Sequence, residues 1–192
     1  MGRLWNVPVL GMMERPGEHI EQRGASPTAR AIQVRGAFTV TPRDDWPPIT
    51  LVDDVLTTGA TATSDRITEI GIIEVDEDGS VREWQQLVNP GTRIPPFIEQ
   101  LTGISNELVA AAPAFADVAD ETWRRLEGRL FIAHNARFDY GFLKNEFKRL
   151  GVTFRAPVLC TVKLSRRLFP EHKRHNLDSL IERHNLAVGA RH

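Results

Sequence analysis

The sequence lacks three features that would point to particular classes of protein. It has a single cysteine, Cys160, so it forms no internal disulfide, and this is typical of a reducing, cytoplasmic compartment. No apolar run approaches the ~20 residues of a membrane span, and the first residues lack the pattern of a signal peptide. The net charge is only −1, so an extensive basic surface for binding nucleic acid is not expected. A nuclease that binds only a few nucleotides would not need such a surface.

The sequence is long enough, and contains enough hydrophobic residues, for one domain with a hydrophobic core. Of its 192 residues, 41% are hydrophobic and 26% are charged. Its texture changes near residue 49. Residues 1–48 are rich in Arg, Gly and Pro with little periodicity, so we expect little regular structure there, whereas residues 49–192 carry sustained patterns and should form the folded domain.

The hydrophobic pattern of residues 49–192 predicts strands and helices in a definite order. Strands are expected at 49–56, 66–76, 80–90, 129–134 and 157–160. Helices are expected at 96–105, 106–113, 115–128, 136–151, 161–168 and 175–186. Three strands therefore precede an alternation of strand and helix. This order predicts an α/β fold, with a mixed sheet of an antiparallel three-strand meander plus parallel strands, flanked by helices.

The stretch LVDDVLTTGAT at residues 51–61 is the first sign of chemistry. An apolar strand there ends in two acids and a loop of small residues. Such acids could hold the hydroxyls of a sugar while the backbone N–H groups of the loop cradle a phosphate. Alternatively, an acid could hold a divalent metal that cuts a phosphodiester.

From residue 54 onward the chain resembles the proofreading-type 3′–5′ exonucleases, the family of the bacterial replicase epsilon subunit, which has a ribonuclease-H-like fold. The resemblance covers about 140 residues in order. It is carried by DRITEIG (65–71), LVNPGTRIPPFIEQLTGIS (87–105), FIAHNARFDYGFL (131–143) and HNLDSLIERHNL (175–186). The family's first motif falls on Asp54 to Gly59 and its second on Asn135 to Asp139.

The resemblance implies a two-metal nuclease that takes Mg²⁺ or Mn²⁺ and acts on single-stranded DNA or RNA 3′ ends, in the company of replicase or repair proteins. Asp54 and Asp139 would be its metal ligands, and together with His192 they would be catalytic. The His would take the proton of the attacking water. The implied substrate contacts are Thr57, Thr58, Gly59, Leu101, Thr102, Ile104, Asn135 and Phe138, among which the segment 101–104 resembles an apolar wedge against the terminal base.

Two positions depart from the exonuclease pattern. Leu56 stands where the family has a glutamate that bridges both metals, and leucine offers no oxygen. The family's closing aspartate, about five residues beyond the position of His192, is absent from this sequence. We therefore expect a C-terminally truncated version of the fold with impaired catalysis. One alternative is a catalytically dead nucleic-acid-binding fusion product. The other, implied by a second resemblance of residues 51–61, is a phosphoribosyltransferase-like protein that binds phosphoribosyl pyrophosphate.

The same opening stretch also resembles the phosphoribosyl-pyrophosphate motif of type I phosphoribosyltransferases. In that frame the ligand contacts are Asp53, Asp54, Thr57, Thr58, Gly59, Ala60 and Thr61. The segment VRGAFTV (34–40), and more weakly residues 9–40 as a whole, resemble the competence-associated (ComF-like) branch of that family. Both motifs share residues 57–59, so we hypothesise that a transferase fragment, poorly structured over 1–48, is joined there to an exonuclease domain.

Two further clusters of polar residues, a pair of histidines and a group of basic residues, do not by themselves indicate a functional site. His172 and His175 are close in sequence but lack cysteine partners or a helical i, i+4 spacing, so a zinc site is not expected. The basic residues Arg166, Arg167, Lys173 and Arg174 are either a solvated face or a phosphate contact, and the sequence leaves both open.

Overall fold

The computed structural model describes residues 13–14, 39–40 and 47–184. Two short strands, β1 (Met13–Glu14) and β2 (Thr39–Val40), pair antiparallel. Apart from these strands and the two prolines that precede β3, residues 1–48 lie outside the described residues, so their expected lack of regular structure stays a prediction.

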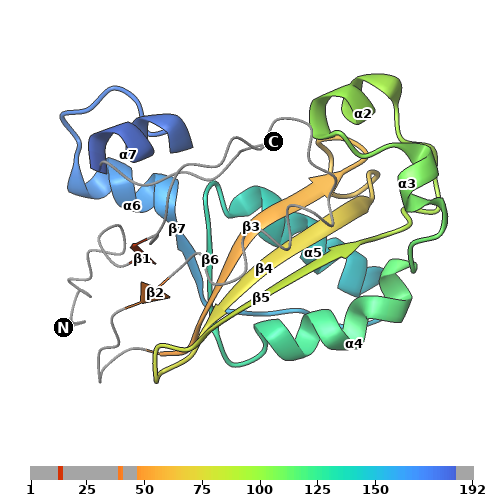
Figure 1. Ribbon diagram of the computed structural model, residues 1–192, viewed down its shortest axis with the longest axis horizontal. Helices are drawn as coiled ribbons and strands as arrows, with labels where there is room; N and C mark the ends of the chain where they lie inside the picture. Colours follow the sequence, from red (N-terminus) through yellow and green to blue (C-terminus); the bar gives the residue numbers. More distant parts are fainter. Residues whose placement is uncertain (1–12, 15–38, 41–46, 185–192) are drawn as a thin grey trace.

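A five-stranded mixed sheet forms the centre of the molecule (Figure 1). Its strands are β3 (Ile49–Thr57), β4 (Ile67–Val75), β5 (Val81–Leu87), β6 (Leu130–Ala133) and β7 (Val158–Cys160), in the spatial order β5-β4-β3-β6-β7. Strands β3, β4 and β5 are antiparallel neighbours, whereas β6 runs parallel to both β3 and β7. The predicted α/β architecture, with its meander followed by parallel strands, is thereby confirmed.

Six helices are described around this sheet. They are α2 (Pro96–Thr102), α3 (Asn106–Ala110), α4 (Phe115–Leu126), α5 (Arg137–Arg149), α6 (Thr161–Leu168) and α7 (Leu177–His184). Figure 1 shows α2 and α3 near the end of β3, and α6 and α7 on the opposite side beside β7. No helix in the described part of the chain is long and apolar enough to cross a membrane.

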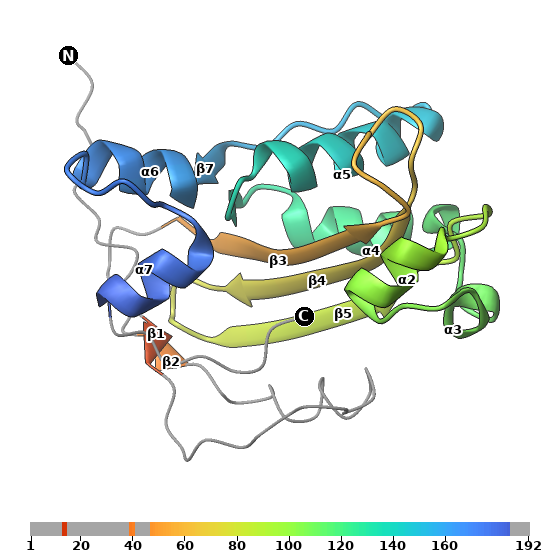
Figure 2. The ribbon, with the colours of Figure 1, turned by 90° about the horizontal axis from the view of Figure 1, so that it is seen from above.

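The main apolar core lies between the sheet and the helices α4 and α5. The buried residues of α4 recur every three or four positions, which puts them on one stripe of the helix. They meet sheet residues such as Val55 and Ile70 together with Phe142 and Phe147 of α5. Figure 2 shows α5 running along β3, so this packing also holds the beginning of α5 against the sheet.

A second, smaller core lies under α2 and α3. It consists of the buried residues Ile94, Ile98, Ile104 and Val109, with the partly buried Leu56, Leu87 and Ala112 packed against it. Because Leu56 and Leu87 belong to β3 and β5, this core attaches the two short helices to the sheet.

Candidate functional site

Strand β3 carries an irregularity at its two adjacent aspartates. Val52 pairs with Ile72 and Asp54 pairs with Gly71, so Asp53 is an extra residue without a pairing partner on β4. A β-bulge of this kind bends the strand and changes how the following residues are directed, and bulges are frequent next to active sites. The side chains of both aspartates lie outside what the structure describes.

The second half of the candidate site is the turn between β6 and α5. Asn135 is exposed and adopts a left-handed backbone conformation, with φ of 64°, and its carbonyl oxygen accepts the N–H of Phe138 at 2.9 Å. Phe138 is half-buried and lies 4.8 Å, between ring centroids, from Phe142. Asp139 follows in the first turn of α5, where the helix dipole favours a carboxylate, and its side chain is only 8% exposed.

The parallel pairing of β3 and β6 brings these two segments to the same edge of the sheet. Residues 49–51 of β3 pair with residues 130–132 of β6, so both strands point the same way. Beyond the paired residues, the chain after Ala133 and the chain after Val52 therefore extend in the same direction. Ligands of α/β sheets bind at the carboxyl ends of such parallel strands. A separation of about 8 Å or less between the carboxylates of Asp54 and Asp139 stays a prediction.

The loop after β3 is held by hydrogen bonds within the chain. Thr58 is buried; its N–H donates to the carbonyl oxygen of Arg66 at 2.8 Å, and its hydroxyl accepts the N–H of Arg66 at 3.0 Å. The carboxylate of Asp65 accepts the N–H of Thr61 at 2.7 Å and lies where a side chain on Gly59 would be. Thr57 is buried and its hydroxyl donates to the carbonyl oxygen of Gly59.

These bonds bear on the phosphoribosyl-pyrophosphate interpretation of the loop. A phosphate cradle needs free backbone N–H groups. Here the N–H groups of Thr58 and Thr61 are already donating, and a carboxylate occupies the concave side of the loop at Gly59, while Ala60 is exposed. The role of Asp65 in closing the loop was missed by the sequence reasoning. The sequence signal for this role was the segment DRITEIG (65–71), which resembles the exonuclease family and begins at Asp65.

An ion cluster around the buried Glu146 attaches the same loop to α5, and it too was not predicted from the sequence. Glu146 is buried and accepts two hydrogen bonds from Arg66, at 2.7 and 3.0 Å, and one from Arg149 at 2.9 Å. The hydrogen bond and the charge of Glu146 raise the pKa of the Arg66 guanidinium, despite its partial burial. Arg149 also donates to the carbonyl oxygen of Thr63 at 3.0 Å. The available signal was that Glu146 lies seven residues after Asp139, two turns along one face of α5.

Helix α2 presents the expected wedge only in part. Leu101 is 71% exposed and Phe97, one turn earlier, is 66% exposed, so an apolar pair faces solvent near the end of β3. Ile104, by contrast, is buried in the small core. Thr102 donates its hydroxyl to the carbonyl oxygen of Ile98 at 2.8 Å, which stabilises the end of the helix.

Two histidines of the described part of the chain, His134 and His175, have side-chain partners. The Nδ1 atom of His134 lies 2.9 Å from the hydroxyl of Thr161, and that of His175 lies 2.9 Å from the hydroxyl of Ser165. His192 lies outside the described residues. Among the side chains that the structure describes, which exclude those of Asp53, Asp54 and His192, no group of three His, Cys, Asp or Glu could hold a metal ion.

The sequence of this chain is similar to segments of much longer bacterial proteins. The chain is 40% identical over 136 residues to the 3′-5′ exonuclease DinG of Bacillus subtilis (strain 168), covering 69% of this chain and 14% of that protein. It is 38% identical over 132 residues to a PolC-type DNA polymerase III of Caldanaerobacter subterraneus, covering 69% of this chain and 9% of that protein. The chain thus spans only a small part of the length of these relatives.

Solved structures give the same picture of the fold. Exonuclease X in complex with 5′ overhanging duplex DNA aligns with a TM-score of 0.58 and 27% identity, over 73% of this chain and 75% of that one. A product-bound exonuclease I aligns with a TM-score of 0.62 over 72% of this chain and 39% of that one, and at 18% identity it shows the fold alone. The sequence model of the exonuclease family (RNase_T) matches residues 51–192. The chain therefore belongs to the exonuclease family, as a domain with the ribonuclease-H-like α/β fold.

Proposed function

We propose that this domain engages the 3′ ends of DNA or RNA strands at the edge of the sheet formed by β3 and the β6–α5 turn. The observation that supports this most is the parallel pairing of β3 with β6, because it aligns the backbone of Asp54 with the segment from Asn135 to Asp139. In this proposal Asp54, Asp139 and His192 carry the chemistry. Replication or repair is the proposed setting, since one relative is a DNA polymerase III.

The terminal nucleotide would lie between this edge and helix α2. Leu101 and Phe97 are exposed apolar side chains there, and apolar or aromatic surfaces hold the faces of unpaired bases. Residues 57–59 lie in a loop that is held in place by the hydrogen bond from Thr61 to Asp65 and by Arg149, the partner of Glu146. The loop could therefore position the substrate without rearranging. Exonuclease X, solved with an overhanging DNA duplex, supports a nucleic-acid substrate.

The donor groups do not complete a two-metal site. Bound Mg²⁺ or Mn²⁺ would neutralise a phosphate oxygen and generate hydroxide, and oxygen ligands from several elements are needed to hold two such ions. Asp54 and Asp139 would supply carboxylates. Leu56 supplies none, and its side chain packs against the small apolar core instead. We therefore propose that the chain binds strand ends but hydrolyses them weakly.

A rescue experiment tests this proposal. Mononucleotide release from a 3′-labelled single strand is measured with Mg²⁺ for the chain itself, for Leu56→Glu, for a C-terminal extension carrying an aspartate about five residues after His192, and for both changes together. Only the doubly repaired chain should cleave, because metal ligands act as one unit and their effects are not additive. Asp139→Ala in the repaired chain should then abolish cleavage.

One result would contradict the assignment of the motif. If the doubly repaired chain stays inert while it binds single strands normally, Asp54 and Leu56 have been placed in the wrong frame. Calorimetry with phosphoribosyl pyrophosphate tests the alternative. That alternative predicts binding of phosphoribosyl pyrophosphate. We expect none, because the backbone N–H groups of Thr58 and Thr61 already donate hydrogen bonds within the loop.

A further inference from the structure

A groove with a volume of about 730 Å³ lies between α5, β7 and α6, next to the candidate site. Four cationic side chains line it: Arg137 and Lys144 from α5, and Lys163 and Arg167 from α6. The rest of its lining is mainly small or apolar, and none of the described residues that line it is acidic. The groove therefore combines a positive rim with an apolar floor.

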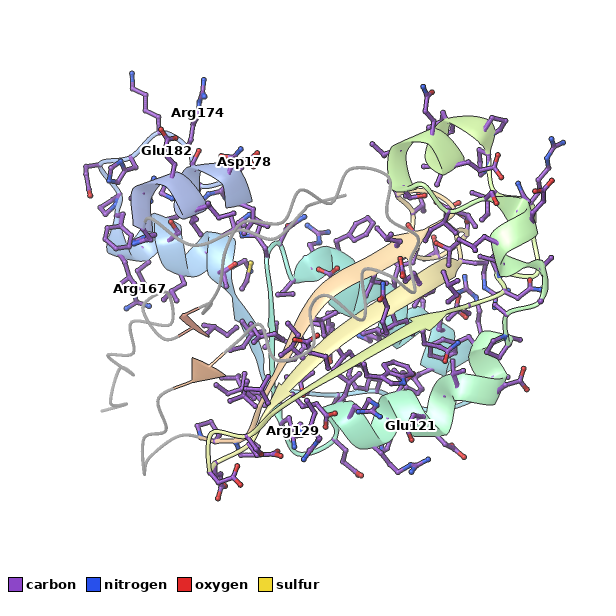
Figure 3. The ribbon with its side chains drawn as sticks, in the orientation of Figure 1. Glu121, Arg129, Arg167, Arg174, Asp178 and Glu182 are labelled. Atoms are coloured by element: carbon purple, nitrogen blue, oxygen red, sulfur yellow. The ribbon has the colours of Figure 1, made fainter. Side chains whose placement is uncertain are left out.

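These four charges share one groove and have no carboxylate partner among the residues that the structure describes. All four side chains are exposed, and none forms a salt bridge with any residue in the described part of the chain. Some arginines elsewhere, such as Arg66, are paired with carboxylates, whereas others, such as Arg166, also lack a salt bridge to any described residue but do not line the groove. Figure 3 shows Arg167 pointing away from the side on which Asp178 and Glu182 lie. Four unpaired cations around one groove favour an anionic ligand.

The spacing of the cations favours a chain of anions over a single one. Arg137 and Lys144 are seven residues apart on α5, or about 10 Å along the helix, and Lys163 and Arg167 are one turn apart, or about 6 Å. The charges thus form two rows beside the apolar floor. Nucleic-acid single strands fit this arrangement, because their phosphates can follow the cations while their unpaired bases contact apolar surface. A duplex would offer the floor only phosphates.

We propose that this basic groove holds the backbone of the single strand whose 3′ end is engaged at the edge beside Asp139. This inference rests on the proposed function and extends it from the terminal nucleotide to those behind it. Arg137 lies two residues before Asp139, in the same first turn of α5, so the groove begins where a strand leaves the candidate site.

The test is the salt dependence of binding to a 5′-fluorescein-labelled oligothymidine, measured by fluorescence anisotropy in EDTA so that no cleavage occurs. The groove variant is Lys144→Gln/Lys163→Gln/Arg167→Gln. The matched control is Lys148→Gln/Arg166→Gln/Lys173→Gln, which removes the same charge from exposed positions outside the groove.

For a single strand, each phosphate contact contributes about 0.7 to the slope of log K against log salt, so the groove variant should lower that slope by about 2. Its Kd at low salt should rise about tenfold, while the control changes little. Lys144→Gln and Lys163→Gln alone should each lower the slope by about 0.7, which keeps the test decisive if the triple variant fails to fold.

Equal slopes for the groove variant and the control would overturn the inference. The inference would also be overturned if the groove variant lost as much affinity for a blunt duplex as for the single strand, because the groove would then bind phosphates of either kind of nucleic acid. If the unaltered chain fails to bind oligothymidine at all, the proposed function fails as well, and this result differs from a failure of the groove alone.

Discussion

At the scale of single residues, Leu56 is the position at which we expect a substitution to affect the proposed chemistry most. Its side chain is half-buried against Ile94, Ile98 and the rest of the small core. Leucine therefore stabilises the attachment of α2 and α3 at the position where the resemblance to the exonucleases predicts a metal-bridging glutamate.

Replacing Leu56 with Glu should destabilise the chain without metal. A carboxylate placed against this apolar surface should cost roughly 1–3 kcal/mol in EDTA. Mg²⁺ or Mn²⁺ should restore part of that loss if Asp54 and Asp139 are near, because a ligand that binds only the native state stabilises it. Urea unfolding with and without metal measures both effects. Leu56→Gln is the control, and equal metal responses for Glu and Gln would contradict the assignment.

Glu146 is the second residue with a large expected effect. In Glu146→Ala, Arg66 and Arg149 lose their common partner, and the loop at residues 58–66 loses its attachment to α5. Because both arginines are about one-third exposed, the loss of unfolding free energy should be about 2 kcal/mol, below that of a fully buried pair. Glu121→Ala, on the surface of α4 (Figure 3), should cost less than about 1 kcal/mol by the same denaturation measurement. A reversed order would show that the cluster is not structural.

At the scale of elements, the hydrophobic patterns predicted nearly all of the secondary structure. The apolar run of the strand expected at 66–76, the alternation of the strand expected at 80–90 and the helical repeat in α4 are local signals. They predicted the bounds to within a few residues. The bulge at Asp53, the loop closure by Asp65 and the Arg66–Glu146 pair were not predicted. Arg66 and Glu146 are 80 residues apart, so their contact depends on the packing of α5 on the sheet and not on any local pattern.

The end of the β4–β5 hairpin should make stability depend on pH. Burial alone would raise the pKa of Asp76, but the hydrogen bond and charge of Arg129, the charge of Arg82 and the hydrogen bond from Ser80 lower it below its ordinary value. This carboxylate thus stabilises the fold fully above the unfolded pKa of about 3.9, and the contribution is lost as the pH falls through the lower, folded pKa.

Asp76→Asn should consequently lower the free energy of unfolding at pH 7, and the difference from the unaltered chain should shrink towards pH 3. Denaturation at several pH values measures this. Glu77→Gln, an exposed neighbour in the same turn, is the control and should show little difference at pH 7. A difference for Asp76→Asn that grows as the pH falls would contradict the assigned sign.

Helix α2 offers a direct comparison between a binding position and a core position. Leu101→Ser removes an exposed side chain, so stability should change by less than about 0.5 kcal/mol while affinity for single strands falls severalfold. Ile98→Ala opens the small core and should cost about 2–4 kcal/mol of stability. Anisotropy and denaturation separate the two. Unchanged affinity in Leu101→Ser would remove this helix from the proposed site.

At the scale of the whole molecule, the candidate site could be predicted only as positions along the chain. The motif at Asn135 to Asp139 was identified from sequence, and the structure places it beside β3 through parallel pairing. The basic groove was not predicted as a unit, because its cations come from two helices. Of the four basic residues that are close in sequence, Arg167 lines the groove, while Figure 3 shows Arg174 on the opposite side of α6 and α7.

The main sheet and both apolar cores are built from residue 49 onward. Deleting residues 1–46 should therefore change the unfolding free energy by less than about 1 kcal/mol, since the deletion removes no strand of that sheet. Chemical denaturation of the shortened chain measures this. A larger loss, or a compact N-terminal unit that survives limited proteolysis, would contradict the proposal that residues 1–48 are a fragment.

The unmatched residue in β3 also has a consequence for how the length of this strand can vary. Val52 and Asp54 keep their partners on β4 on either side of Asp53, so the ladder absorbs one residue without shifting its neighbours. Loss of one aspartate would leave both flanking registers unchanged, whereas loss of a residue such as Val55 would displace every pair beyond it. The strand can therefore lose one residue at the aspartate pair, next to its candidate catalytic position, while the rest of the sheet keeps its alignment.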